Sequence, residues 1–293
     1  MLDRLLDRVR SVVGSGPVAT TRRVLDRYSA AGGGLLAGGL AYAALFAIVP
    51  ALLLVAGVTG LVISDPDTRA RVVDTIAGVL PPVRDLAAVV LAEASRDATP
   101  VSLVGALALV WGASRFAVVF EVAIARVTGG ARHRSLLRSN LDALLAVILV
   151  VVAILAATVV AGLLAFLDAG ASTGFLAVLD RGLGLALTIL PITMAVGAVA
   201  AAYRVVPLPR PGWRAVAIPA VVVGLVLVAL GRTFIFLAPR LIGAAALLGT
   251  LASLFAALAW LSLSFQVLLV GAAWTAEREA GSARSGPTRG RGD

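Results

Sequence analysis

Ionisable side chains inside long apolar stretches are the residues of this chain most able to do chemistry. Arg115 lies well inside one such stretch, Glu121 follows it, Asp142 opens the next stretch, and Arg232 lies in a later one. Such a group is costly within a bilayer unless it is paired, hydrated or near an interface. We therefore expect Arg115 to face a bundle interior, a cavity or a partner. Glu121, Asp142 and Arg232 are expected near an interface.

Two roles remain open for Arg115. It is either a structural arginine, satisfied by helix carbonyls or a carboxylate, or a contact for an anionic ligand or lipid headgroup. Glu121 and Arg232 are weaker candidates for the same ligand. Gln266 lies in another apolar stretch, and hydrogen bonding between helices is favoured for it over ligand binding.

Patterns typical of enzymes are missing from the sequence. His133 is the single histidine and there is no cysteine, so neither a multi-histidine nor a thiolate metal site is expected. The chain also has no phosphate-binding GxxxxGK[ST] loop and no recognisable carboxylate pair within its apolar stretches. We expect no catalytic residues, no metal and no cofactor.

The composition identifies lipid as the solvent of this chain. Hydrophobic residues make up 60% and charged residues 14%, whereas globular proteins average roughly half and a quarter. The net charge of +9 is carried by arginine alone, because the chain has no lysine. On a soluble protein this surplus would indicate nucleic acid; here we expect anionic membrane lipids as partners and no nucleic acid.

Stretches long enough to cross about 30 Å of hydrocarbon predict an all-α, polytopic membrane bundle of about six transmembrane helices. The spans are expected near residues 35–63, 101–125, 141–167, 182–202, 215–238 and 250–275. The membrane domain, residues 35–275, follows a basic N-terminal segment, residues 1–34. A tail, residues 276–293, is expected to be disordered. Pro239 and Arg240 are expected to end the fifth span.

Amphipathic helices are expected on both sides of the membrane. Residues 2–13 form an apolar stripe, and with the basic stretch around Arg22, Arg23 and Arg27 they are expected on the membrane surface. Loop 64–100 has two apolar stripes on either side of Pro81 and Pro82. This pattern predicts an extracytoplasmic helical hairpin that lies against the bundle or the outer leaflet.

Prolines and small residues interrupt the spans. Pro50, Pro191 and Pro219 each remove a backbone donor and predict helix kinks. Kinks occur in inert bundles and also at transporter substrate sites, so both functions stay open. Gly34 and Gly38 form a GxxxG pair, for which packing within the chain is favoured over a dimer contact.

Arginine counts predict the orientation. The N-terminal segment, the second and fourth loops and the tail contain seventeen arginines, whereas the first, third and fifth loops contain six. Because basic loops stay in the cytoplasm, both termini are predicted to be cytoplasmic. The protein is then a multi-pass protein of the inner, or plasma, membrane.

Four segments together resemble a known family. They are LAYAALFAIVPALL at 40–53, WGASRFAVVFEVAIAR at 111–126, YRVVPLPRPGW at 203–213 and WLSLSFQVLLVGA at 260–272. Over residues 20–278 the chain resembles the BrkB/YihY family of bacterial inner-membrane proteins, also called envelope integrity or virulence factor proteins.

The resemblance adds Ser114 and Tyr42 to the candidate binding residues. The family's LAYYxLFSxxP pattern is matched at Leu40, Ala41, Tyr42 and Pro50, with Ala43 and Ala47 at its second tyrosine and its serine. Its WxxSR pattern is matched by Trp111, Ser114 and Arg115. Its C-terminal GAE and following Asn become Gly271, Ala272, Ala273 and Thr275, so no role of that carboxylate is carried over.

The resemblance implies a role in envelope integrity, through binding or translocation of an anionic lipid or another amphiphilic envelope component. One rival is a non-transporting scaffold, in which Arg115 is structural and the outer hairpin binds an envelope partner. A homo-oligomer and an envelope partner protein both stay open. A remote rival, a membrane-bound ribonuclease, follows from a label on some members and has no support in these residues.

Overall fold

A computed structural model describes residues 16–62, 98–130, 189, 192–207, 209–244 and 250–285. The regular elements in these ranges are helices, which confirms the predicted all-α class. The long helices are α2 (Gly16–Ala30), α3 (Gly33–Val62), α6 (Ala98–Thr128), α9 (Trp213–Ala244) and α10 (Thr250–Ser285). A shorter apolar helix spans Ile192–Val205. The N-terminal helix 2–13, the span 141–167, Pro191 and nearly all of the outer hairpin lie outside the described residues.

Helices of membrane-spanning length make up most of the described chain. Leu107–Thr128, Trp213–Leu237 and Leu254–Ser282 are each long and apolar enough to cross a membrane. Val18–Ala30 and Gly33–Ile48 pass the same test together, as a pair bent by 62°. By length and composition, the described residues thus contain three candidate spans, or four with the bent pair, as a multi-pass membrane protein requires.

Two helix ends differ from the predictions. Helix α9 continues through Pro239 and Arg240 to Ala244, and the Arg240 guanidinium donates to the Phe236 carbonyl at 2.9 Å. Helix α10 continues past Thr275 to Ser285, through residues that were expected to be disordered. The reason is tertiary, because this last part of α10 makes polar contacts with α2 and with the start of α9.

The 62° bend between α2 and α3 lies at Gly32 and not at a proline. Gly32 has a φ of 71°, a left-handed conformation that glycine adopts without steric cost. The next residue, Gly33, lies against the Tyr28 ring, where a Cβ atom would collide with the ring carbons. Tyr28 thus fixes the path of the chain and holds α2 at an angle to α3. Pro50 lies inside α3, and Pro219 is buried near the start of α9.

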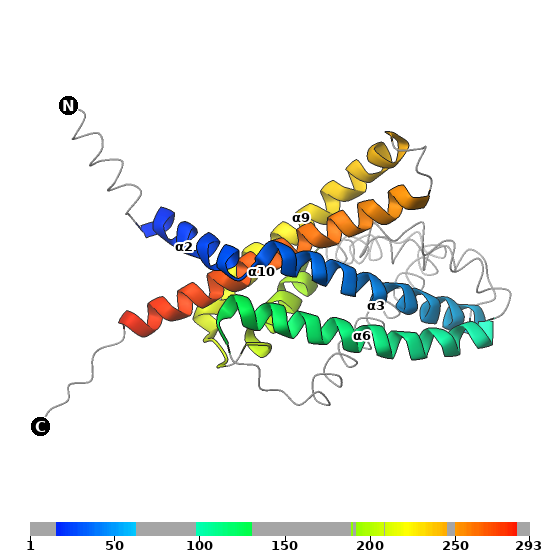
Figure 1. Cartoon of the computed structure of the whole chain (residues 1–293), viewed down its shortest axis with the longest axis horizontal. Coiled ribbons are helices and arrows are strands. Elements are labelled where there is room, and N and C mark those ends of the chain that lie inside the picture. Colours follow the sequence, from blue (N-terminus) through cyan, green and yellow to red (C-terminus); the bar gives the residue numbers. More distant parts are fainter. Residues whose placement is uncertain are drawn as a thin grey trace, which may run out of the picture.

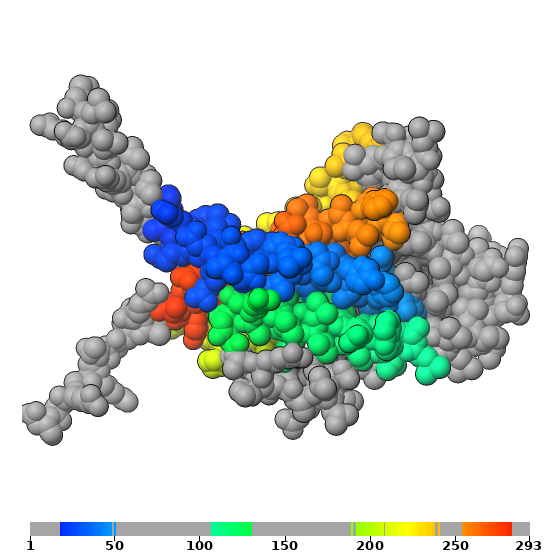
Figure 2. Space-filling model, viewed as in Figure 1, coloured from blue at the N-terminus to red at the C-terminus, as the bar shows by residue number. Residues whose placement is uncertain are grey.

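Helices α3 and α6 lie side by side along one face of the molecule (Figures 1 and 2). Their close approach is at Gly112, where an added Cβ atom would collide with the Phe46 carbonyl oxygen. Gly34 and Gly38 are exposed instead, with nothing in the described structure near a Cβ placed on either. The predicted intramolecular packing of that pair is therefore not seen, and Gly112 is where a missing side chain lets helices approach.

The larger hydrophobic core of the described residues lies toward one end of the bundle, where α2, the start of α3, α6, α9, α10 and the helix Ile192–Val205 converge. Its fully buried members include Leu40, Ile124, Tyr203, Val216 and Leu269. We call this the arginine-rich end, because its segments carry arginines that the sequence assigns to one side of the membrane. They are Arg22, Arg23, Arg27, Arg126, Arg204, Arg210, Arg214 and Arg278. Figure 1 shows α2 and the C-terminal part of α10 together at this end.

Candidate functional site

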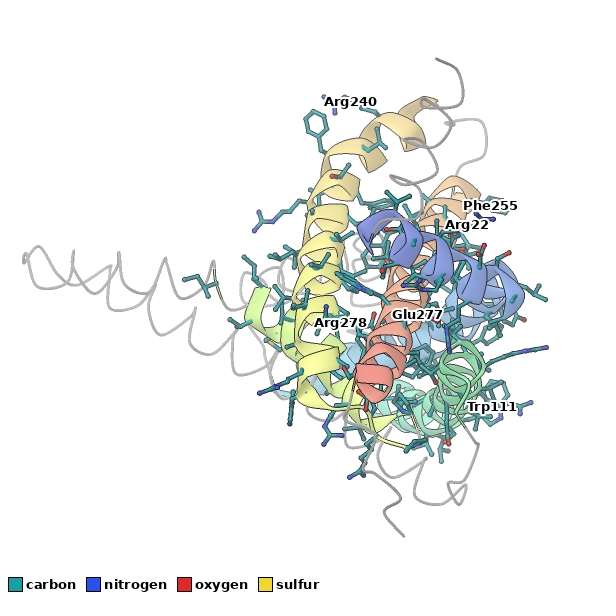
Figure 3. The ribbon with its side chains drawn as sticks, turned by 90° about the vertical axis from the view of Figure 1, so that its left-hand side faces the viewer. Arg22, Trp111, Arg240, Phe255, Glu277 and Arg278 are labelled. Atoms are coloured by element: carbon teal, nitrogen blue, oxygen red, sulfur yellow. The ribbon has the colours of Figure 1, made fainter. Side chains whose placement is uncertain are left out.

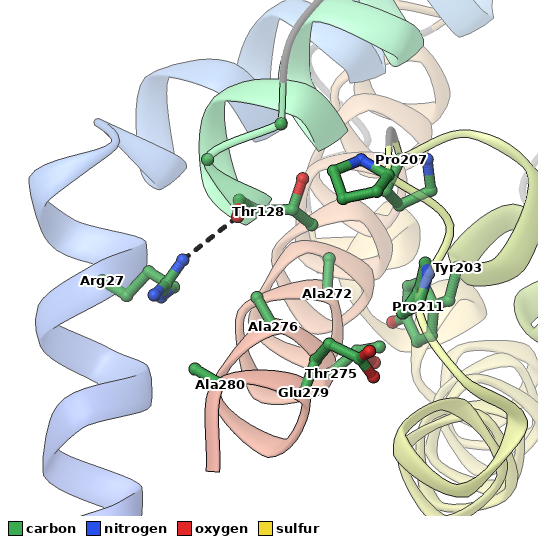
Figure 4. A pocket seen from close by; sticks show the side chains of 13 residues that line it. Arg27, Thr128, Tyr203, Pro207, Pro211, Ala272, Thr275, Ala276, Glu279 and Ala280 are labelled. Atoms are coloured by element: carbon green, nitrogen blue, oxygen red, sulfur yellow. Dashed lines mark hydrogen bonds between the residues drawn. The ribbon is translucent and has the colours of Figure 1, made fainter. Parts of the chain in front are cut away.

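A cavity of about 280 Å³ lies at the arginine-rich end (Figure 4). Its floor is one face of α10, formed by Ala272, Thr275, Ala276, Glu279 and Ala280. Spacings of three and four residues bring these positions to one face of a helix. Most residues of that face are alanines, and their small side chains do not fill the space between α10 and the cavity walls.

The first wall of the cavity combines α2 with the end of α6. Helix α6 ends at Thr128, followed by Gly129 with a φ of 74°. The Gly130 N–H donates to the Ala125 carbonyl at 3.0 Å, the long-range bond of a Schellman ending. The Arg27 guanidinium donates to the Thr128 carbonyl at 3.1 Å. A cation here satisfies a terminal carbonyl and also interacts favourably with the helix dipole.

Arg27 also belongs to an ion cluster that ties α2 to α10. Its Nε lies 3.0 Å from Glu277 Oε1, and Arg23 Nε lies 3.6 Å from Glu277 Oε2. The Glu277 side chain is 11% exposed and that of Arg27 is 32% exposed, so water screens this pair less than a surface pair. Two guanidiniums share one carboxylate, which leaves the cluster with a net positive charge. Figure 3 shows Glu277 among the helices, whereas Trp111 lies at the outer side of α6.

The second wall is the proline-rich segment between the helix Ile192–Val205 and α9. Pro207, Pro209 and Pro211 line the cavity, and their fixed φ angles stiffen this connection. The Tyr203 hydroxyl donates to the Leu268 carbonyl at 2.6 Å, and burial raises the pKa of this hydroxyl. It stays a neutral donor. Gly271 leaves room for the Tyr203 hydroxyl, which a Cβ atom on that glycine would meet.

Polar bonds attach α10 to this wall as well. Glu279 Oε2 accepts the Gly212 N–H at 3.0 Å, and the Arg278 guanidinium donates to the Arg214 carbonyl at 3.1 Å. Arg204 lies over the Trp213 ring, 5.8 Å from its centroid. The cavity therefore has fixed walls on both sides, one arginine, one carboxylate and an otherwise largely apolar lining.

The candidate residues predicted from the sequence lie elsewhere in the bundle. Arg115 is exposed on α6 and has no hydrogen-bond or ion-pair partner among the described residues. Ser114 Oγ donates to the Val110 carbonyl at 2.6 Å, within its own helix. Tyr42 is 60% exposed on α3, and its ring centroid lies 4.7 Å from that of Phe46. Ligand binding by these three residues remains a prediction.

The remaining candidates are also separate from the cavity. Glu121 is half-buried on α6 and Arg232 is exposed on α9. Gln266 Nε2 lies 3.4 Å from Ser262 Oγ, one turn away on α10. None of the described candidates lines the cavity, and Asp142 lies outside the described residues. The structure thus does not bring the sequence candidates together at this site.

Sequence reasoning missed the residues that build the cavity. In the sequence Arg27 is one basic residue among several, and Glu277 and Glu279 fall within the tail that is expected to be disordered. A signal was present, because Arg23 and Arg27 are one turn apart and the two glutamates follow an apolar span directly. Their partners are far away in sequence, so the pairing itself could not be deduced from spacing.

Comparison with known proteins assigns a family and nothing finer. The family model described as virulence factor BrkB matches residues 24–292. No curated protein and no solved structure matches the chain.

Proposed function

Because the chain belongs to the BrkB virulence factor family, we propose that it maintains the envelope by binding an amphiphile with a phosphate-bearing headgroup. The binding site is the cavity at the arginine-rich end. The protein then moves this amphiphile across the inner membrane without an ATPase of its own. The observation that carries the proposal is an apolar cavity with a guanidinium in its wall, in a protein whose solvent is lipid.

Arg27 is the residue that would meet the phosphate. It uses one N–H on Glu277 and one on the Thr128 carbonyl, and a guanidinium has further donors. The surrounding cluster keeps a net positive charge, because Arg23 also pairs with Glu277. A phosphate can therefore join the cluster without displacing Glu277. Guanidinium–phosphate hydrogen bonds are charge-assisted and stronger than those between neutral groups.

The size of the cavity selects which part of an amphiphile enters. Drug-sized ligand pockets run from roughly 300 to 1,000 Å³, and this cavity, at about 280 Å³, is slightly below that range. It accommodates a headgroup with the adjoining glycerol and first chain carbons. The rest of the chain would stay in the surrounding lipid, so the site suits a molecule that is partly held by the membrane.

Absence of cysteine from the chain permits a direct binding test with a single introduced thiol. Ala276→Cys places that thiol on the cavity floor, and a polar maleimide reports its accessibility in maltoside detergent. We expect lysophosphatidylglycerol to slow labelling, and an uncharged monoacylglycerol of equal chain length to have no effect. Ser29→Cys, on the exposed side of α2, is the control and should label equally with either lipid. Equal labelling of Ala276→Cys with both lipids would contradict the proposal.

A matched pair of variants separates ligand binding by Arg27 from its structural role. In the Ala276→Cys background, Arg27→Gln should weaken protection by lysophosphatidylglycerol about tenfold, through loss of a charge-assisted contact. Glu277→Gln breaks the same ion pair but keeps the guanidinium, so protection should persist. Equal loss of protection in both variants would mean that Arg27 only holds the helices together.

Translocation needs its own experiment, because a scaffold could bind lipid without moving it. Liposomes containing the protein and a fluorescent anionic lipid are treated with a membrane-impermeant quencher. Movement between leaflets should make the inner-leaflet probe accessible in a protein-dependent manner. Binding without such movement would favour the non-transporting scaffold.

The proposed orientation places the cavity at the cytoplasmic leaflet, on the basis of the arginine distribution. A cytoplasmic reporter fused after Ala280 should be active, and alkaline phosphatase at the same point should be inactive. Phosphatase activity there would place the cavity at the opposite leaflet.

A further inference from the structure

Glu279 is a charged residue that lines the cavity and makes no contact with the phosphate in the proposed binding mode. Its Oε2 accepts the Gly212 N–H at 3.0 Å, which fixes the carboxylate against the proline-rich wall. Its other oxygen makes no hydrogen bond with the described residues. A carboxylate has lone pairs for several donors, so Glu279 can accept further hydrogen bonds from a ligand in the cavity.

Arg27 and Glu279 lie on opposite sides of the cavity floor. Ala272, Ala276 and Ala280 form one row along α10, with spacings of four residues. Glu277, which holds Arg27, is on the flank next to Ala276, whereas Glu279 is on the other flank. Figure 4 shows the same arrangement, with Arg27 on one side of Ala276 and Glu279 on the other. The alanine row between them leaves room for a small bridging group.

This arrangement gives the cavity a positive side and a negative side. A headgroup with only negative charge gains from Arg27 but is repelled by Glu279. A headgroup whose phosphate is joined to an ammonium can satisfy both. A primary ammonium has three N–H donors, whereas a trimethylated one has none, so only the primary amine can hydrogen-bond to the Glu279 carboxylate.

We infer that the cavity selects a zwitterionic lipid headgroup of the phosphoethanolamine class, with its phosphate at Arg27 and its primary ammonium at Glu279. This inference rests on the proposed function, because it names the headgroup class for the same cavity. It commits to a membrane lipid as the source, since the cavity belongs to a chain whose described helices are mostly of membrane-spanning length.

The thiol-protection assay on Ala276→Cys tests the inference with two probes of equal chain length, lysophosphatidylethanolamine and lysophosphatidylglycerol. The protein should bind the ethanolamine lipid roughly two- to fivefold more tightly, as expected for one partly exposed charge pair. Glu279→Gln should bring this ratio close to one. The glutamine keeps a carbonyl oxygen for the Gly212 N–H, and thermal unfolding checks that the fold is preserved.

Asp26→Asn is the matched control, because it removes an acid at the same end but outside the cavity. It should leave the lipid ratio unchanged. A ratio near one in the unsubstituted cavity, or one unaffected by Glu279→Gln, would overturn the inference while leaving phosphate binding intact. Protection by neither lipid would instead overturn the proposed function. Equal protection by soluble phosphoethanolamine would contradict a lipid source.

Discussion

Charged side chains pair between helices at the arginine-rich end, whereas Arg115 on the α3–α6 pair has no partner among the described residues. At the arginine-rich end, Arg23, Arg27 and Glu277 connect α2 to α10, and a cavity lies beside them. Around Arg115, α3 and α6 approach closely at Gly112 and pack Ala41 and Ala44 against Phe116, and the arginine itself is exposed. An isolated intramembrane charge is thus conspicuous in the sequence, whereas the charges that build a site lie at helix ends.

The two regions are also held together by different interactions. Helices α3 and α6 depend on the close approach at Gly112, so they should be sensitive to added volume. The arginine-rich end depends on ion pairs and hydrogen bonds between distant segments, so it should be sensitive to lost partners. Substitutions of each kind test this division.

The largest effect is expected for Gly112→Val. Its Cβ atom would collide with the Phe46 carbonyl oxygen, and backbone cannot move aside as a side chain can. Overpacking costs typically 1–3 kcal/mol and sometimes more, so we expect a loss of about 3 kcal/mol in thermal unfolding in detergent. Gly38→Val, at an open position, should change the melting temperature little. Equal effects would show that α3 and α6 do not approach at Gly112.

Glu277→Gln should be the next most damaging substitution. It leaves two arginines without their carboxylate in a largely buried place, and removing one partner of a buried pair is destabilising. Because Arg23 is half exposed, we expect about 2 kcal/mol, less than for a fully buried pair. Asp26→Asn, in a surface pair with Arg22, should cost at most about 0.5 kcal/mol. A neutral Glu277→Gln would mean that the cluster does not hold α10.

A smaller effect is expected for Tyr203→Phe. The substitution removes the 2.6 Å hydrogen bond to the Leu268 carbonyl and little packing, so the free energy of unfolding should fall by about 1 kcal/mol. Tyr42→Phe, on the exposed face of α3, is the control and should be neutral. A neutral Tyr203→Phe would indicate that this wall does not depend on that bond.

Arg115 should have the smallest effect on stability. It has no partner among the described residues, so Arg115→Ala and Arg115→Lys should each stay within about 0.5 kcal/mol in thermal unfolding. If it binds ligand, Arg115→Lys keeps part of the activity and Arg115→Ala loses it. Full complementation of an envelope-defective strain by a stable Arg115→Ala protein would remove Arg115 from the candidates. A drop in stability with both variants would make it structural.

The sequence predicts helices far better than it predicts the contacts between them. Apolar length placed α3 and α6 within a few residues, because the thickness of a membrane sets that length. The apolar pattern does not predict the bend at Gly32, which depends on the packing of the Tyr28 ring against Gly33. It also does not predict the last part of α10, because Glu277 pairs there with Arg27 of α2, 250 residues away in the sequence.

The candidate site was less predictable for the same reason. The sequence alone marks Arg115 as a candidate, because a charge inside an apolar stretch is costly within a bilayer. The cavity needs Arg27, Glu279 and a proline-rich wall to converge, and no spacing rule joins segments so far apart. Family resemblance marked residues 203–213 as a motif, and the structure shows this segment as one wall of the cavity.

We propose above all that the cavity at the arginine-rich end holds a lipid headgroup. An experimental map of the protein in nanodiscs of phosphatidylethanolamine and phosphatidylglycerol tests it most directly. We predict non-protein density on the Ala276 floor, with its phosphate at Arg27 and its amine at Glu279. A cavity filled by the chain's own side chains, with ordered lipid at Arg115 instead, would contradict the claim.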